Sequence, residues 1–516
     1  MSVVVDVFSW FSQCGRAGLI ARVMFVLCYG LVAGPALAAD ADIKTLLQAL
    51  SAQVAGLQKQ VERSNARIEQ LEQELQHYRA EQLATNKAGT VSVSGQTGSP
   101  PAAPIAVVGA ASSVSGDKAK DKPAVTVGDV KGTFKIPGTD TSVGLGGFVK
   151  MDTLFNSVSA GRDRLGDQQL AMAQIPVGAA GERGQITFHG KESRLWFKSF
   201  TPDSGWGDIN TYLEFDFYGD PATYTYTPRL RHAYGSIGHF LGGQAWTTFL
   251  NVAALPDTLD VGGSAGAVTS LRQPLVRWTE PFSWLDMPME WQLALEAPRS
   301  RLWVDSRLES SVANRSGASD PNLDAAYYIN PSADRYPDLM ARLNLNPAWG
   351  NLSLAAVGRQ LRYTNSSTGY RQDGWGGGVN LAGRISTFGL DNVRFMAHYG
   401  EGIGRYVSTQ NVFADAALDS HGGIDLVSSY GGELSYQHWW NKQWRSSVTY
   451  GFAQADYPAF ANSVLTRQVQ SVHANLLWSP VSQAMLGVEY TYATRELIDG
   501  RDGVLQRVQF SARYSF

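Results

Sequence analysis

The segment that most constrains the fold is the last one, Val504–Phe516, because its polarity alternates up to the final residue. The residues at even positions are mostly apolar and include Val504, Val508, Phe510, Ala512, Tyr514 and Phe516. Those at odd positions are mostly polar and include Arg507, Gln509, Ser511, Arg513 and Ser515. Strict alternation predicts a β-strand with one apolar face and one wet face. Transmembrane barrels place aromatic residues at the membrane interface. The pattern therefore favours the closing strand of a barrel over the alternative, an edge strand of a soluble sandwich.

Composition supports the barrel. Of 516 residues, 17% are charged, and the chain has 53 Gly, 14 Trp and 21 Tyr, which suits a barrel better than a soluble α/β enzyme. The net charge of −3 gives no sign of nucleic-acid binding. No apolar run after residue 40 approaches the ~20 residues that a membrane helix requires. A membrane protein with this sequence would therefore span the bilayer with strands.

Residues 1–38 are predicted to be a secretory signal peptide. The apolar run Val23–Ala33 follows two arginines and precedes the small-residue cleavage site Ala36-Leu37-Ala38. The alternative, a short membrane anchor, is disfavoured because the run is too short. Both cysteines, Cys14 and Cys28, would leave with the signal, so the mature chain would contain no disulfide.

Residues 39–83 are predicted to form a periplasmic coiled coil, because apolar residues repeat in heptads. The core positions are Leu47, Leu50, Val54, Leu57, Val61, Ile68, Leu71 and Leu75. Branched residues at the first core position with Leu at the second nominally favour two strands. Residues 84–131, rich in Ala, Ser, Gly and Pro, are predicted to be a flexible linker.

Residues 132–516 are predicted to form an outer-membrane β-barrel. About sixteen segments alternate with a period of two, as in Ile209–Phe217. Their connections alternate in length: 347–349 and 388–390 are tight, whereas 298–336 and 404–427 are long. Short turns on one rim and long loops on the other are typical of an up-and-down barrel with both termini in the periplasm. A barrel of this size is expected to leave an aqueous lumen.

The third long loop, 250–270, is expected to fold into the lumen and to place Asp257 and Asp260 at a constriction; the alternative is an ordinary surface loop. A basic wall of the constriction is predicted on strands that become neighbours when the barrel closes. Its members are Lys150, Arg194, Arg231, Arg507 and Arg513. The alternative is that these residues lie at different depths and simply keep the lumen wet.

Catalytic motifs are missing from the sequence, so neither an enzyme nor a cofactor or metal site is predicted. Two other functions stay open beside a diffusion channel. Trp196, Tyr212 and Tyr218 share the predicted lumen parity and would suit a sugar-selective porin. The coiled coil would suit a structural outer-membrane tether with an incidental pore.

The sequence resembles the DcaP-like family of trimeric outer-membrane porins. The resemblance rests on the N-terminal heptads and on the order of short motifs, which are Gly147–Asp152, Ser193–Leu195, Gly243–Trp246, Pro256–Asp260, Arg272–Pro274 and Tyr399–Gly404. It implies a homotrimer of sixteen-stranded barrels, embedded in outer-membrane lipid, that passes small anionic solutes such as dicarboxylates. The trimer is preferred here over the two-stranded indication of the heptads.

The C-terminal pair Tyr514 and Phe516 also resembles the signal by which bacterial outer-membrane proteins are recognised for insertion. This resemblance implies that the outer-membrane insertion machinery is a partner during assembly.

Overall fold

A computed structural model describes most of the chain from residue 126 to the C-terminus. The described ranges are 126–159, 168–178, 183–219, 225–266, 271–305, 328–329, 334–364, 369–407 and 412–516. All of them belong to one compact unit, Asp117–Phe516. The predicted signal peptide, the predicted coiled coil and nearly all of the predicted linker lie outside the described residues.

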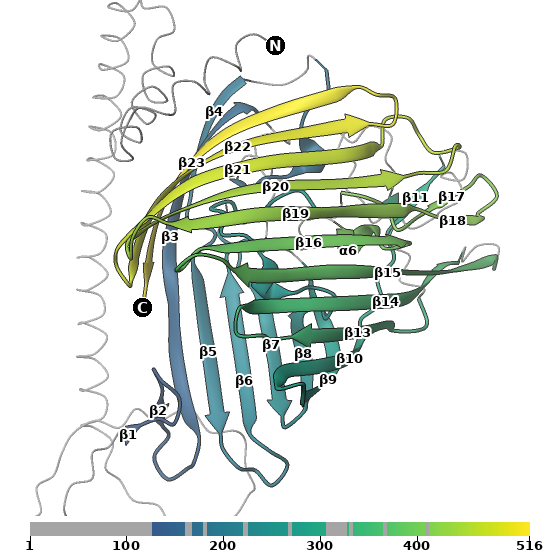
Figure 1. Cartoon of the computed structure of the whole chain (residues 1–516). Coiled ribbons are helices and arrows are strands. Elements are labelled where there is room, and N and C mark those ends of the chain that lie inside the picture. Colours follow the sequence, from purple (N-terminus) through teal and green to yellow (C-terminus); the bar gives the residue numbers. More distant parts are fainter. Residues whose placement is uncertain are drawn as a thin grey trace, which may run out of the picture. The chain divides into compact units, whose positions relative to one another are not determined.

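One antiparallel sheet closes on itself to form a barrel (Figure 1). Its strands are β3 (Ser142–Val158), β4 (Arg183–His189), β5 (Arg194–Thr201), β6 (Ile209–Asp216), β7 (Arg229–Ile237), β8 (Phe240–Trp246), β9 (Arg272–Trp284), β10 (Met287–Glu296), β13 (Asp338–Leu345), β14 (Gly350–Thr364), β15 (Arg371–Ser386), β16 (Asn392–Glu401), β19 (Ser428–Trp439), β20 (Trp444–Asp456), β21 (Thr466–Val481), β22 (Ala484–Leu497) and β23 (Asp502–Ser515). Both β4 and β5 pair with β3, so they are one interrupted strand and the barrel has 16 strands.

The barrel closes where β23 pairs with β3, with Val508 opposite Phe155 and Arg513 opposite Lys150. Along β23 the apolar Phe510 is 49% exposed on the outer face, whereas Arg507 is 0% exposed on the inner face. Apolar residues outside and polar residues inside are the reverse of a soluble barrel and match a membrane environment. The predicted fold of this region is therefore confirmed.

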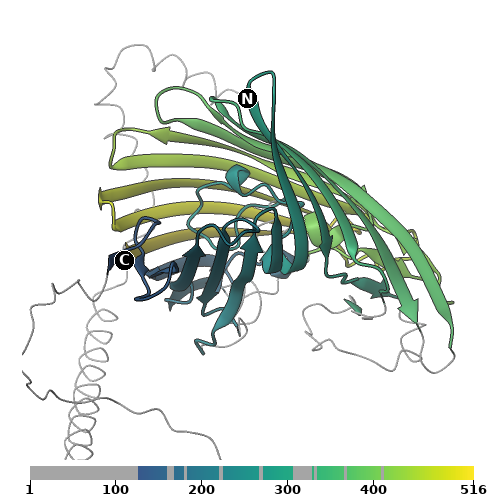
Figure 2. The ribbon, with the colours of Figure 1, turned by 90° about the horizontal axis from the view of Figure 1, so that it is seen from below.

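Figure 1 and Figure 2 show two unequal walls. Strands β14–β23, coloured green to yellow, form one broad curved wall, and the shorter strands β5–β8, coloured blue to teal, stand on the other side. No helix among the described residues is both long and apolar enough to cross a membrane.

Two of the long connections contain secondary structure that the sequence pattern did not predict. They contribute helix α6 (Gly404–Val407) and the strands of a second sheet, whose order is β12 (Tyr328–Ile329), β11 (Leu302–Val304), β17 (Ala416–Leu418) and β18 (Ile424–Leu426). Leu302 and Leu418 pack in a fully buried cluster against Leu361 of β14. One side of the lumen is therefore filled with packed side chains, whereas an aqueous lumen was expected.

A short hairpin precedes the barrel. Strand β1 (Thr126–Val127) pairs with β2 (Phe134–Lys135), and β2 pairs with the start of β3. The hairpin begins within the segment predicted to be a linker.

The C-terminal residue takes part in barrel closure through its backbone. The Phe516 N–H donates to the Gly147 carbonyl at 3.0 Å, and the Gly147 N–H donates to the Phe516 carbonyl at 3.1 Å. The Phe516 side chain is 58% exposed on the outside.

Deleting Phe516 should lower the amount of protein in the outer membrane. The thermal stability of barrel refolded in detergent should stay nearly normal, because the rest of the β23–β3 pairing is retained. Quantitative immunoblotting of outer membranes and melting of refolded protein would measure the two effects. Phe516→Tyr is the control that keeps an aromatic terminus; equal membrane levels for the deletion and this control would contradict an assembly role.

Candidate functional site

Loop L3, residues 247–266 between β8 and β9, lies against the inner wall of the barrel. Side-chain donors of the wall bind its backbone carbonyl groups at successive positions along the loop. The pairs are Arg342 with Leu250 at 2.5 Å, Asn380 with Phe249 at 2.8 Å, Arg394 with Leu255 at 2.6 Å, Asn475 with Asp257 at 2.6 Å and Gln509 with Leu259 at 3.1 Å. These donors belong to β13, β15, β16, β21 and β23. The loop therefore follows the broad wall, and none of these five donors lies on β5–β9.

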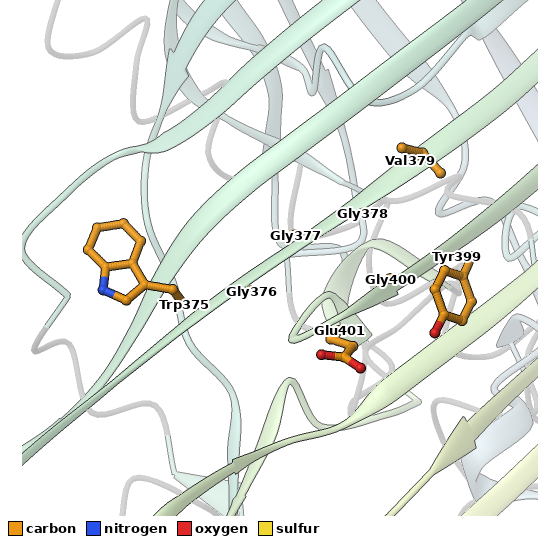
Figure 3. A pocket seen from close by; sticks show the side chains of 8 residues that line it. All are labelled: Trp375, Gly376, Gly377, Gly378, Val379, Tyr399, Gly400 and Glu401. Carbon is orange, nitrogen blue, oxygen red and sulfur yellow. The ribbon is translucent and has the colours of Figure 1, made fainter.

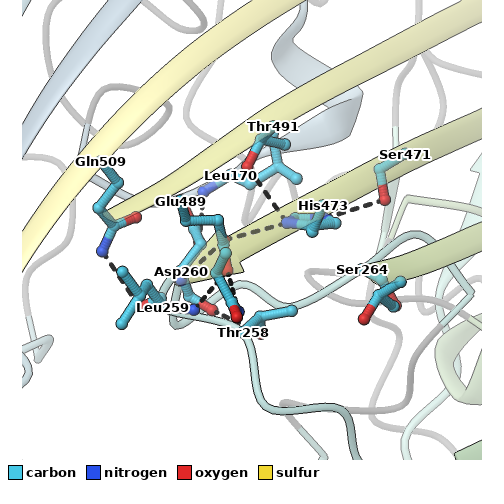
Figure 4. A network of polar contacts seen from close by, with 12 residues as sticks. Leu170, Thr258, Leu259, Asp260, Ser264, Ser471, His473, Glu489, Thr491 and Gln509 are labelled. Carbon is cyan, nitrogen blue, oxygen red and sulfur yellow. Dashed lines mark hydrogen bonds and ion pairs between the residues drawn. The ribbon is translucent and has the colours of Figure 1, made fainter. Parts of the chain in front are cut away.

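A carboxylate of the wall holds the tip of L3 (Figure 4). Glu489 accepts hydrogen bonds from the backbone N–H groups of Leu259 at 2.7 Å and Asp260 at 3.4 Å. His473 lies beside Glu489 at 3.1 Å and contacts Ser471, whose hydroxyl oxygen accepts the Ala265 N–H at 2.8 Å. The tip is thus fixed by groups that are themselves buried and bonded.

Asp260 ties L3 to a second internal segment. Its carboxylate pairs with the Arg507 guanidinium and accepts the Gly262 N–H at 2.7 Å. It also accepts the N–H of Leu170 at 2.9 Å, from the segment 168–178 that contains the 3-10 helix η2 (Met172–Gln174). Burial alone would raise the pKa of Asp260, but Arg507 and the two N–H groups outweigh burial and lower this pKa below its ordinary value.

This shift predicts how L3 responds to acid. Because the folded-state pKa of Asp260 is below the unfolded value of about 3.9, its stabilisation is fully present above that pH and is lost as pH falls through the folded pKa. Hydrogen exchange in 256–266, corrected for intrinsic rates, should not change from pH 7 to about pH 4 and should accelerate below. In Asp260→Asn, hydrogen exchange in 256–266 should be faster than in wild type even at pH 7. If exchange in the wild type already accelerated at pH 6, and did not do so in this variant, the pKa assigned to Asp260 would be wrong.

Asp257, the other predicted constriction acid, binds the same wall. Its carboxylate accepts hydrogen bonds from Arg445 Nε at 2.7 Å and Gln437 Nε2 at 2.8 Å, on β20 and β19. Both acids were expected to lie opposite a basic wall. In the structure Asp257 pairs with an arginine outside that set, and Asp260 contacts one of its members directly. Both acids are therefore paired with described residues of the wall.

The predicted basic residues separate into two groups. Lys150 and Arg507 bind L3: Lys150 donates to the Leu259 carbonyl at 2.8 Å and pairs with Glu192 at 2.5 Å, while Arg507 pairs with Asp260. Arg231 is buried and its charge is balanced, because it contacts Glu214 at 2.6 Å and Asp216 at 2.9 Å. These three cations serve the structure of the wall and of the loop.

Arg194 and Arg513 form the second group. Their guanidinium carbons lie 5.1 Å and 5.4 Å from the centre of the Phe148 ring, which stands between them on β3. The Nε atom of each has no hydrogen-bond partner. The nearest carboxylate to Arg194 is Glu214 at 3.7 Å, and Arg513 has no ion pair within the described chain. Each of the two guanidinium groups therefore keeps a donor that no described residue satisfies.

The sequence pattern did not indicate a channel role for Arg272, the first residue of β9. Its guanidinium carbon lies 4.3 Å from the Trp246 ring centre, and its Nη1 atom has no partner. Arg272–Pro274 is among the motifs that carry the family resemblance, but the sequence pattern alone did not indicate that the Arg272 side chain stacks on Trp246.

A buried ion cluster holds the other internal loops. Arg359 of β14 pairs with Asp415 at 3.0 Å and with Asp338 at 3.4 Å, and all three side chains are 0% exposed. Tyr406 of α6 donates to Asp338 at 2.6 Å. This cluster fastens α6 and the segment before β17 to the same broad wall as L3.

A pocket of about 300 Å³ near Trp375 and Glu401 lies outside the channel (Figure 3). Its lining includes Val379 and Tyr399, which are 49% and 55% exposed on the outer face of β15 and β16. It therefore faces the membrane and is not part of the solute path.

A closed barrel with an apolar outer face, a polar inner face and an inward third loop defines an outer-membrane channel. The chain belongs to the porin subfamily, whose family profile matches residues 118–498. This membership and the fold identify a channel and place it in the outer membrane, and they confirm the expected DcaP-like porin family.

Two solved porin structures are similar to this chain. The outer-membrane channel DcaP of Acinetobacter baumannii is 21% identical, with 74% of this chain and 99% of that chain covered and a TM-score of 0.58. An anion-selective porin from Comamonas acidovorans is 10% identical, with 73% and 100% covered and a TM-score of 0.43. No protein with curated functional information matches this chain.

Proposed function

We propose that the chain is a passive diffusion channel that prefers small anionic solutes such as dicarboxylates. The observation that carries this proposal is the pair Arg194 and Arg513, which flank Phe148. Arg513 has no ion pair among the described residues, and Arg194 has only a long contact with Glu214, at 3.7 Å. The acids of L3 do not oppose this pair, because Asp257 and Asp260 are paired with Arg445 and Arg507. No acid of L3 is therefore left to oppose the pair, and the carboxylate nearest to it is that of Glu214, 3.7 Å from Arg194.

The positions of individual charged side chains in the lumen decide the anion preference, since the net charge of the whole chain is −3 and would not favour anions. Two unit charges about 4 Å apart interact by about 4 kcal/mol at an effective dielectric near 20, and a narrow lumen concentrates such a field. The planar guanidinium group of Arg matches the geometry of a carboxylate better than the ammonium group of Lys does. Binding must remain weak for the solute to leave.

The test is the double variant Arg194→Gln with Arg513→Gln in a planar bilayer under a KCl gradient. The reversal potential should shift towards cations, and succinate flux should fall, while the barrel remains heat-modifiable. Arg467→Gln is the matched control, because Arg467 is 47% exposed and pairs with Glu496 at the rim. An unchanged ion preference and unchanged succinate flux in the double variant would reject the proposal.

The assembly implied by the resemblance belongs to the same proposal: a homotrimer in outer-membrane lipid, inserted by the assembly machinery, with the coiled coil in the periplasm. Native mass spectrometry of the full chain and of a 41–125 deletion tests it. Trimers from both would support barrel-driven assembly, and monomers from both would reject the trimer. The alternative of a structural tether predicts that the deletion loses cell-envelope attachment but not conductance.

A further inference from the structure

A row of aromatic side chains crosses the inner face of β5–β8, the strands that carry none of the five donors to the L3 carbonyl groups. Trp196 and Tyr212 are stacked with ring centres 6.5 Å apart, and Tyr212 lies 5.8 Å from Tyr234. His232 continues the row, 5.9 Å from Tyr212 and 5.5 Å from Trp246. These residues come from separate strands, so the row is a surface made by the closed sheet.

The row is not explained by membrane contact. Its residues share the inner face with Glu214 and Arg231, while the outer face of the same strands carries Leu195 and Phe197. Apart from His232, which is 6% exposed, the aromatic rings are partly exposed to the lumen. Inner-face aromatics that are neither core nor membrane belt provide an apolar surface on which a solute can pack.

Cations flank the row at both ends. Lys198 Nζ lies 5.4 Å from the centre of the Trp196 ring, and the Arg272 guanidinium carbon lies 4.3 Å from that of Trp246. Arg272 Nη1 is buried without a hydrogen-bond partner. A carboxylate on a solute that rests on the row could satisfy this donor.

Hydrogen-bonding groups also border the rings. Glu214 accepts the Tyr212 hydroxyl at 2.8 Å and Arg231 Nε at 2.6 Å, which leaves lone pairs on both oxygens for further donors. His232 Nδ1 is buried and has no partner. A solute that carries only acceptors would meet the Glu214 carboxylate unfavourably, whereas hydroxyl groups could donate to it.

We propose that this row is a transport subsite for sugar acids, that is, monosaccharides that carry a carboxylate. The inference rests on the proposed anion-preferring channel and names a solute class for it. The apolar face of the pyranose ring lies on Tyr212 and Tyr234, the hydroxyl groups bond to Glu214 and His232, and the carboxylate reaches Arg272. Succinate lacks the flat face and the hydroxyl groups, and benzoate lacks the hydroxyl groups.

The experiment measures block of single-channel current by glucuronate, glucose, succinate and benzoate. Glucuronate should block wild type at a lower concentration than the other three. In Tyr212→Ala with Tyr234→Ala, the glucuronate concentration for half block should rise about tenfold, since two ring contacts are lost. Arg272→Gln should weaken block by glucuronate and leave block by glucose unchanged. Tyr450→Ala, on the outer face and bonded to Gln470 at 3.0 Å, is the control.

Benzoate or glucose blocking better than glucuronate, or no response to the double alanine variant, would overturn the sugar-acid subsite. The KCl reversal potential separates this failure from failure of the channel proposal. If anion preference persists and depends on Arg194 and Arg513 while glucuronate is not favoured, only the subsite is wrong. Heat-modifiability of every variant on gels confirms that the barrel has formed before its currents are compared.

Discussion

Replacing Arg359 with methionine should release the loops that fill one side of the lumen, raising conductance and lowering stability. The substitution removes the cation that lies between Asp415 and Asp338, all of them fully buried. Breaking a buried ion pair by removing one partner typically costs about 3–5 kcal/mol, because the other charge is left uncompensated. Arg359 also donates to the Gly402 carbonyl at 3.1 Å, so α6 loses a second attachment.

Thermal melting, protease cleavage between β16 and β19, and single-channel recording measure this effect. Arg362→Met is the matched control on the same strand, since Arg362 pairs at 3.2 Å with Asp373, whose side chain is 42% exposed. Arg362 is itself buried, with 7% of its side chain exposed, but Asp373 stays hydrated when its partner is removed, so the loss of stability should be smaller than for Arg359. If Arg359→Met melts and conducts like the control, the cluster does not hold the loops in place.

The second large effect is expected from Gly451→Val, which should displace L3 while the barrel itself persists. A Cβ at this inner-face position would lie 2.0 Å from the Ala265 carbonyl oxygen, a distance that no relaxed contact allows. Gly266, which follows Ala265, also packs closely on the backbone: a Cβ added there would lie 2.3 Å from the Phe452 carbonyl oxygen. Its φ of +75° is a second reason why glycine is needed at this position. Overpacking of this kind costs about 1–3 kcal/mol, so L3 should move before the sheet does.

Conductance of Gly451→Val should therefore be larger and noisier than that of wild type, and exchange in 256–266 should be faster. Gly358→Val is the control, because a Cβ at Gly358 has no heavy atom within 4 Å. Equal conductance for the two variants would show that the contact between Gly451 and L3 does not set the width of the channel.

Alternation in the sequence was sufficient to predict the barrel, because one inner and one outer face impose a period of two on every strand. Phe510 outside and Arg507 inside are the expected outcome. The same signal could not predict the second sheet. Its strands β11 and β17 have 3 residues each, and they pair in parallel between segments far apart in sequence, with Leu302 opposite Ala416.

The site was less accessible to prediction than the fold. Alternation along the strands predicted that Lys150, Arg194, Arg507 and Arg513 lie on the inner face, and they do. Alternation does not predict which of these cations a loop will contact. Lys150 and Arg507 bind L3 because the loop passes over β3 and β23, whereas Arg194 stands clear of it. That distinction depends on the path of the loop, which hydrophobic periodicity does not encode.

The anchors of L3 have a consequence for biogenesis. Apart from Lys150, the donors that hold the loop come later in the chain than the loop itself, from Arg342 to Gln509, and the Asp260–Arg507 contact spans 247 positions. Contacts of such long range form late, after the strands that carry them are in place. A nascent barrel that has not yet joined β23 to β3 therefore lacks its filter and would be an unselective leak. Rapid final closure protects the permeability barrier of the cell as well as the folded protein.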